Sequence, residues 1–254
     1  EFCFFFSVAA FDLAERLQTP VMVLRDLDIG MNDWMCRELK WDDAWQPDRG
    51  KVLPLEEIVK LEKFHRFLDK DDDGIPYRTL PGVHPKAAYF TRGSGHNQFG
   101  AYTEDSAEYQ VVVDRLIRKF HTARTHMPRP VFEMAGARTD VAIVAAGSSD
   151  GAVREALAVL RGMGINAENM RVRAFPFNDE VDRFLDSHTL IFVVEQNRDA
   201  QLRSLLTLET PVEKARLRSL LHYSGLPISS SFIIEGVLAE VAPKPLRSVA
   251  PHGA

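Results

Sequence analysis

The sequence is poor in cysteine, and this limits the metal and redox chemistry that it can carry. Its two cysteines, Cys3 and Cys36, lie far apart in a chain of 254 residues. Two thiols cannot supply the four ligands of an iron–sulfur cluster or of a structural zinc site, so any metal–sulfur centre must lie on another chain. Low cysteine content is typical of a reduced compartment, and we expect a cytoplasmic protein.

Long apolar runs and an excess of basic residues are also missing. No apolar stretch approaches the ~18 residues that a membrane-spanning helix needs. The 31 lysine and arginine residues are outnumbered by 36 aspartate and glutamate residues, which gives a net charge of −5. Because no block of basic residues occurs, we expect neither nucleic acid nor a membrane as a partner.

The first residues lack an initiator methionine and the features of a signal peptide. The chain begins Glu-Phe-Cys, and no basic residue precedes the apolar run at residues 2–6. The residues that follow, FDLAERLQTP, are typical of an amphipathic helix and not of a cleavage site. We therefore expect a fragment that starts inside a domain.

The first half of the chain shows few regular elements. Apolar residues at helical spacing predict three helices, over residues 4–17, 55–64 and 106–125. A short apolar run predicts a buried strand over residues 21–24, and three tryptophans lie in an extended excursion over residues 34–67. Asp26 and Asp28 follow the predicted strand, where α/β sheets bind their ligands, although carboxylates in such positions also cap turns.

From residue 139 the chain alternates strands with helices. Apolar runs predict strands over residues 141–146, 167–174 and 189–194. Helices are expected over residues 150–163 with Ser149 as N-cap, after Asn178, over residues 200–208 and over residues 210–221. This alternation predicts a doubly wound parallel sheet and therefore an α/β protein. A proline-containing linker at residues 127–130 precedes the sheet.

An acidic segment before the third helix matches half of a calcium-binding loop. Asp69, Asp71 and Asp73 alternate and are followed by Gly74, as in loops that surround a cation with oxygen ligands. The last position of such a loop should be a bidentate Glu, but here it is Leu80. Two interpretations stay open: bound Ca²⁺ or Mg²⁺, or an acidic turn that is capped by its own side chains.

A glycine-rich segment, TRGSGHN, follows a predicted strand over residues 87–90. Glycines let backbone N–H groups approach an anion, and Arg92 could hold a phosphate or carboxylate. His96 could act as an acid or base, because the ordinary pKa of histidine lies near neutrality. A tight loop at a subunit contact, in which Asn97 also takes part, explains the same residues equally well.

Two further polar turns stand at the ends of predicted strands. Gly147, Ser148 and Ser149 could bind an anion at the N-terminus of a helix, although they lack the spacing of a dinucleotide-binding motif. Residues 195–199 are five polar residues in a row, which suits either catalysis or a polar network between subunits.

Five segments are together similar in sequence to segments of one protein family: AERLQTPVMVLRDLDIGMNDW, DDDGIPYRTLPG, HPKAAYFTRGSGHN, VVEQNRDAQL and LHYSGLPI. On these segments the chain closely resembles the alpha subunit of 2-oxoacid:ferredoxin oxidoreductases, and the 2-oxoglutarate enzymes are the nearest branch. The resemblance runs from about Ala14 to Ile234 and is specific as a set, whereas no single segment is.

The resemblance implies two domains. Residues 1–130 would be the C-terminal part of a thiamine-pyrimidine-binding domain with a long ordered excursion. Residues 131–241 would be a transketolase C-terminal-like domain with a doubly wound parallel sheet, followed by a frayed tail at residues 242–254. The family's Glu that activates the thiamine ring lies upstream of the matching region and has no counterpart here.

The resemblance also implies a reaction, namely the oxidative decarboxylation of a 2-oxoacid with coenzyme A to acyl-CoA and CO₂, with electrons passing to ferredoxin. Thiamine diphosphate and Mg²⁺ would be shared with a beta subunit, which would also hold the iron–sulfur cluster. The expected assembly is a heterodimer or a dimer of heterodimers, in which this fragment is scaffold and subunit interface and is inactive alone.

The resemblance implies no confident catalytic residue. The family's glycine-rich loop often reads Gly-Leu-Glu-His-Asp-Glu, and at the matching residues 93–98 its three acids are replaced by neutral residues. We expect Arg92, His96 and Asn97 to lie near the mouth of the beta subunit's active site in a positioning role. Two alternatives remain: a non-catalytic α/β module that binds Ca²⁺ on its Asp-rich loop, and a stand-alone enzyme with a phosphate site at residues 147–149.

Overall fold

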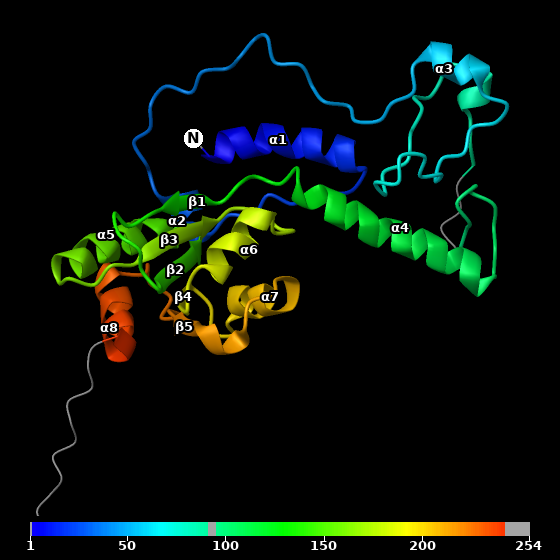
Figure 1. The fold of residues 1–254 in the computed structure, drawn as a ribbon. Helices are drawn as coiled ribbons and strands as arrows, with labels where there is room; N and C mark the ends of the chain where they lie inside the picture. The colour runs from blue at the N-terminus through cyan, green and yellow to red at the C-terminus, as the bar shows by residue number, and fades with distance from the viewer. Residues whose placement is uncertain (1, 91–94, 242–254) are drawn as a thin grey trace, which may run out of the picture. The chain divides into compact units, whose positions relative to one another are not determined.

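The computed structural model describes residues 2–90 and 95–241, which fall into two compact units (Figure 1). The first unit takes the described residues of 1–25 and 31–127, and the second takes those of 26–30 and 128–254. The main division lies between Met127 and Pro128, and the domains expected over residues 1–130 and 131–241 stay a prediction. The grouping of residues 26–30 with the second unit has no signal in the sequence. The predicted tail at residues 242–254 lies outside the described residues.

The second unit is built on a five-stranded sheet with strand order β1-β3-β2-β4-β5. Its strands are β1 (Val131–Glu133), β2 (Val141–Ala146), β3 (Glu168–Val172), β4 (Leu190–Glu195) and β5 (Leu217–Leu221). Neighbouring strands are parallel except for β1, which runs antiparallel to β3 at one edge. The predicted parallel sheet is therefore confirmed, with an antiparallel edge strand added.

Helices cover both faces of this sheet (Figure 1). They are α5 (Ser149–Gly162), α6 (Asp179–Asp186), α7 (Gln201–Glu209) and α8 (Ser230–Val241). Ile143 and Ala145 pack with the apolar side chains of α5 and α8, whereas Ala142 and Val144 pack with those of α6 and α7. Because successive residues of a strand point to opposite faces, β2 is apolar at every core position. The sheet is thus doubly wound.

Three predicted elements are wrong. The helix predicted over residues 210–221 is a short 3₁₀ turn, η2 (Lys214–Arg216), followed by strand β5, because Leu217 pairs with Ile191 of β4 and is buried. The strand predicted over residues 21–24 does not form, and Leu24 stays 86% exposed. The strand predicted over residues 87–90 does not form: Ala87 ends the 3₁₀ turn η1 (Pro85–Ala87), and residues 88–90 are irregular.

The first unit contains α1 (Phe2–Leu17), α3 (Leu55–Lys60), η1 and α4 (Ser106–Arg124). All of the short helix α2 (Leu27–Met31) except Met31 belongs to the second unit. The apolar core of the first unit is small and consists of Leu17, Ile75 and Ala123, with Leu13 and Met127 beside them. Among the helices of the described residues, none is both long enough and apolar enough to cross a bilayer.

Polar contacts supplement this small core. Arg16 donates from Nε to the carboxylate of Asp48 at 2.7 Å, and its Nη1 lies 2.9 Å from Nδ1 of His126. Because a guanidinium can only donate, Nδ1 must accept, and the ring is held in its neutral form. Burial lowers the pKa of His126, and the positive charge of Arg16 lowers it further.

Acidification should destabilise the first unit through His126. The pKa of this ring is lower in the folded chain than the ordinary 6.5, so the unfolded chain takes up the proton first. The stability that the neutral ring provides is complete above pH 6.5 and is lost as the pH falls through the lower folded pKa. We expect the urea midpoint to fall below this pH, and His126→Gln to remove most of that fall. His121→Gln, at an exposed position of α4, is the control and should behave like the wild type.

Candidate functional site

The turn between β2 and α5 lies at the carboxyl edge of the sheet, where α/β proteins place their ligands. Ser148 is the N-cap of α5, but its side chain makes no capping hydrogen bond. The backbone N–H of Ser148 instead donates to Oδ2 of Asp26 at 2.8 Å. The N-cap predicted at Ser149 is therefore wrong by one residue, and a carboxylate from a distant part of the sequence replaces the local cap.

Asp26 fits this turn closely. Its other oxygen, Oδ1, accepts a hydrogen bond from the backbone N–H of Ile29 at 2.9 Å, so the same carboxylate also caps its own turn. Gly147 has φ +61°, and a Cβ at this position would lie 2.4 Å from Oδ2 of Asp26. Only glycine combines this backbone conformation with the space that the carboxylate needs. Asp26 therefore occupies the anion position at the N-terminus of α5.

Gln196, which directly follows β4, contacts the same turn. Nε2 of Gln196 donates to the hydroxyls of Ser148, at 2.9 Å, and Ser149, at 3.2 Å. The hydroxyl of Ser148 also lies 3.3 Å from Oδ2 of Asp28. Each of these polar side chains has a partner inside the group, so the arrangement holds a turn and presents no activated nucleophile. A phosphate could enter this turn only if Asp26 withdrew.

Two residues of the polar run at residues 195–199, Glu195 and Asn197, serve helix α7. The buried carboxylate of Glu195 accepts hydrogen bonds from the backbone N–H groups of Leu202, at 2.6 Å, and Arg203, at 3.1 Å. The side-chain amide of Asn197 donates to Glu195 at 2.8 Å. These contacts satisfy the free N–H groups of the first helical turn. Capping accounts for these polar residues without a catalytic role.

The Asp-rich loop lies in the first unit and is neutralised by protein cations. Nζ of Lys51 lies 2.6 Å from Asp71 and 2.8 Å from Asp73, and the hydrogen bond from Lys51 lowers the pKa of Asp71. Asp69 accepts from the backbone N–H of Gly74 at 2.8 Å, and Asp72 pairs with Arg118.

The metal interpretation of this loop gains no support from its geometry. In the part of the chain that the structure describes, no group of three or more carboxylate, histidine or cysteine side chains converges as a metal site would require. Asp71 and Asp73 instead share Lys51, and Asp69 accepts from the backbone of Gly74. The contacts favour the second interpretation, an acidic turn that is held by its own side chains and by Lys51.

The glycine-rich loop is described only from Gly95 onwards, so Arg92 lies outside the described residues. The ring of His96 stacks on Phe67 with centroids 4.0 Å apart. Oδ1 of Asn97 accepts hydrogen bonds from the backbone N–H groups of Phe99, at 3.0 Å, and Ala101, at 3.1 Å. Both side chains thus shape the loop, and their expected role beside a partner's active site stays a prediction.

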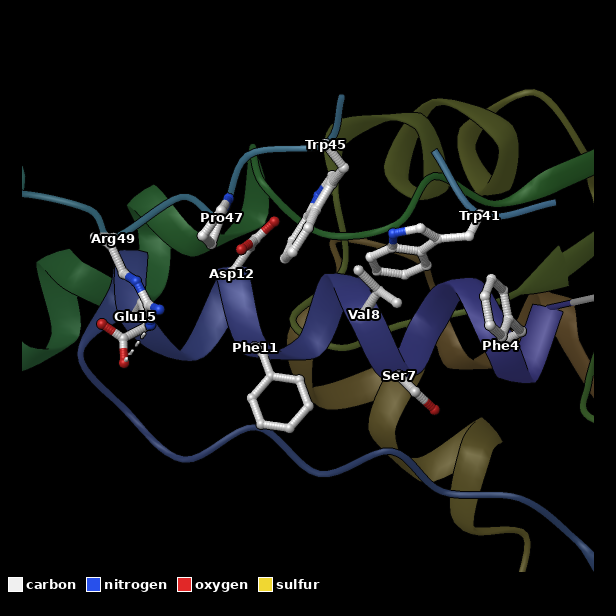
Figure 2. A pocket seen from close by; sticks show the side chains of 10 residues that line it. All are labelled: Phe4, Ser7, Val8, Phe11, Asp12, Glu15, Trp41, Trp45, Pro47 and Arg49. Carbon is white, nitrogen blue, oxygen red and sulfur yellow. Dashed lines mark ion pairs between the residues drawn. The ribbon is translucent and has the colours of Figure 1, made fainter. Parts of the chain in front are cut away.

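A groove of about 420 Å³, which no pattern in the sequence predicts, lies along α1 in the first unit. Figure 2 shows Trp41, Trp45 and Phe4 beside Val8, while Phe11 points away from the tryptophans. The rings of the two tryptophans lie 5.6 Å apart, edge to face. An ion pair between Arg49 and Glu15 closes one end at 3.8 Å. The cluster of tryptophans in the excursion was the available signal, but their spacing does not reveal that they face α1.

The fold of this chain has a counterpart among solved structures. The 2-oxoglutarate:ferredoxin oxidoreductase from Magnetococcus marinus, solved with 2-oxoglutarate, coenzyme A and succinyl-CoA bound, superposes on 90% of this chain and 38% of its own, with a TM-score of 0.74 and 22% identity. At this level of identity the likeness shows the fold. It confirms the expected α/β fold class with a doubly wound parallel sheet.

The relatives by sequence carry the same family name. Subunit alpha of 2-oxoacid:ferredoxin oxidoreductase 2 from Aeropyrum pernix and the alpha subunit of the enzyme from Saccharolobus solfataricus are each 28% identical to the chain, over 98% and 96% of it. No protein-family model matches. The homologues of this chain are thus 2-oxoacid:ferredoxin oxidoreductase alpha subunits, as the resemblance implied, and the chain spans 38% of their length.

Removal of the Asp26 carboxylate should loosen the first turn of α5. We expect Asp26→Ala to lower the free energy of unfolding by about 1 kcal/mol, the usual loss for an N-cap. Gly147→Ala should cost more, because it adds backbone strain and also displaces Asp26. Urea unfolding measures both effects, and hydrogen exchange of the Ser148 amide should become faster.

Glu235→Ala is the matched control for these two variants, because it removes an exposed carboxylate from α8 of the same unit. It should leave the urea midpoint and the exchange of the Ser148 amide unchanged. Equal exchange of that amide in Asp26→Ala and in the wild type would contradict the assigned hydrogen bond.

Proposed function

We propose that this chain is the alpha-subunit portion of a thiamine-diphosphate-dependent 2-oxoacid:ferredoxin oxidoreductase whose substrate is 2-oxoglutarate. The observation that carries the proposal is the 28% identity to named alpha subunits along 98% of the chain. In the proposed reaction, a 2-oxoacid is decarboxylated oxidatively with coenzyme A to acyl-CoA and CO₂, and two electrons pass to ferredoxin. The proposed location is the cytoplasm.

Within this enzyme the proposed role of the chain is that of scaffold and subunit interface. The turn before α5 does not fit the diphosphate of the cofactor, because Asp26 occupies the anion position there. Among residues 2–90 and 95–241, no group of three or more carboxylate, histidine or cysteine side chains would hold its Mg²⁺. The proposal therefore assigns the diphosphate, the metal ion and the iron–sulfur cluster to a beta subunit, in a heterodimer or a dimer of heterodimers.

The preference for 2-oxoglutarate rests on the glycine-rich loop. At Asn97 and Gln98, neutral amides stand where the wider family often has acids. A dianionic substrate approaches neutral groups more readily than carboxylates, because like charges repel. In the proposed complex Arg92, His96 and Asn97 lie near the mouth of the beta subunit's active site, where they position the substrate and do not react with it.

A test is to tag this chain in its native host and to purify the complex that it forms. We expect a beta subunit with bound thiamine diphosphate and an iron–sulfur cluster to copurify. The complex should reduce methyl viologen with 2-oxoglutarate and coenzyme A, and the kcat/KM for pyruvate should be lower.

Two results would count against the proposal. One is turnover of a 2-oxoacid by the isolated chain, because the described residues hold no cofactor site. The other is a purified complex that reduces the viologen with no 2-oxoacid. A complex that accepts pyruvate in preference to 2-oxoglutarate would retain the reaction and overturn only the substrate.

A further inference from the structure

The core-facing side of α4 carries positive charges. The residues of this helix that are buried are Val112, Arg115, Lys119 and Ala123, which share one face at helical spacing. Such a face is normally apolar, and cations that are buried in it normally have partners of opposite charge. Arg115 and Lys119 are each only 8% exposed, so the partners of both need to be identified.

Arg115 is only partly satisfied. Its Nη1 donates to the backbone carbonyl of Gly74 at 2.9 Å, but its buried Nε–H has no partner in the described part of the chain. Burial lowers the pKa of Arg115, the charge of Asp69 raises it, and the charges of Arg66 and Arg118 lower it again. One carboxylate therefore faces several cations, and a buried N–H donor remains free.

Lys119 has weaker support. Its Nζ donates to the backbone carbonyl of Gln18 at a long 3.4 Å. Burial lowers the pKa of this ammonium, and the charges of Arg115 and Arg66 lower it further. Across the described residues, no carboxylate contributes a compensating interaction. An ammonium that is taken out of water without a counter-ion is costly in a folded protein.

The charges of Arg66 and Arg118 lower the pKa of Arg115, and those of Arg115 and Arg66 lower the pKa of Lys119. We call these four residues the α4 cluster. Asp69 and Asp72 balance part of its charge, and both of these carboxylates lie next to Arg118. The side of the cluster around Lys119 is left with excess positive charge. A water molecule could accept from Nε of Arg115, but it would not offset that charge.

We propose that the α4 cluster binds a small oxyanion, a phosphate or a carboxylate group, between Arg66, Arg115 and Lys119. An oxyanion accepts hydrogen bonds from guanidinium and ammonium groups at once, and such charge-assisted bonds are strong. It also supplies the counter-ion that Lys119 lacks. The remaining exposure of Arg115 and Lys119, together with the half-buried Arg66, leaves a route from solvent. The site is independent of the proposed reaction.

Thermal unfolding of the whole chain in rising concentrations of inorganic phosphate, at constant ionic strength, tests the site. A ligand that binds the folded state raises Tm by mass action, so we expect a saturable rise. Sodium chloride at the same ionic strength should produce none. Acetate forms a second arm, and the anion with the larger shift shows whether the cluster prefers a phosphate or a carboxylate.

Lys119→Met keeps the length of the side chain and removes its charge. We expect this variant to lose the anion-dependent rise in Tm, while its Tm without anion stays equal to that of the wild type or exceeds it. Lys60→Met is the matched control, because Lys60 lies exposed on α3, and it should retain the full rise. A rise that persists in Lys119→Met, or a wild type that responds to neither anion, would overturn the proposal.

Arg66→Gln provides a second variant that leaves the core-facing side of α4 intact. Isothermal calorimetry with inorganic phosphate should show a Kd about tenfold weaker than that of the wild type, which is the loss expected for one charge-assisted hydrogen bond. An unchanged Kd would remove Arg66 from the site and contradict the geometry proposed for it.

Discussion

The hydrogen bond from the backbone of Ser148 to Asp26 is the contact on which the carboxyl edge of the sheet depends. It requires glycine at position 147, because a Cβ would occupy the place of the carboxylate. It also frees the Ser148 hydroxyl from capping, so that Gln196 can bridge both serines and connect the end of β4 to the start of α5. One half-buried contact between a carboxylate and a backbone amide thus fixes the turn at which β2, β4 and α5 meet.

Neutralisation by groups of the protein itself also explains the other polar motifs of the chain. Each resembles a ligand site, and in each the protein supplies the opposite charge or the missing donor itself: Lys51 for Asp71 and Asp73, and the N-terminus of α7 for Glu195. A sequence displays the side chains that could bind a ligand, but the partner that neutralises them is distant in the chain. Lys51, for example, precedes Asp71 by 20 residues. Spacing within a motif therefore overstates its chemistry.

Much of the sheet could be predicted, because the central strands are apolar on both faces and are separated by helices that carry apolar residues along one side. The errors fall where contacts with other elements, and not the local sequence, determine the secondary structure. Residues 21–24 are apolar, yet no strand lies beside them, whereas Leu217 becomes part of a strand only because β4 offers it an open edge. The candidate site was half predictable: Asp26 and Ser148 stand after apolar runs, but nothing in the sequence joins them. Gln196 belongs to the polar run at residues 195–199, but nothing in the sequence directs its amide to the two serines.

Charge balance separates the α4 cluster from these motifs. At the Asp-rich loop and at the turn after β2, Asp69, Asp71, Asp73 and Asp26 each accept a hydrogen bond from the protein, although one oxygen of Asp69 has no partner among the described residues. On α4, by contrast, a buried cation lacks a partner of opposite charge. Lys119 is as buried as Arg115, but its hydrogen bond is long and goes to the neutral carbonyl of Gln18. A chain that neutralises its acids so consistently would gain nothing from one unbalanced buried ammonium unless an anion completes it. The excess of positive charge on α4 is therefore a stronger indication of a ligand than any of the motifs that the sequence displays.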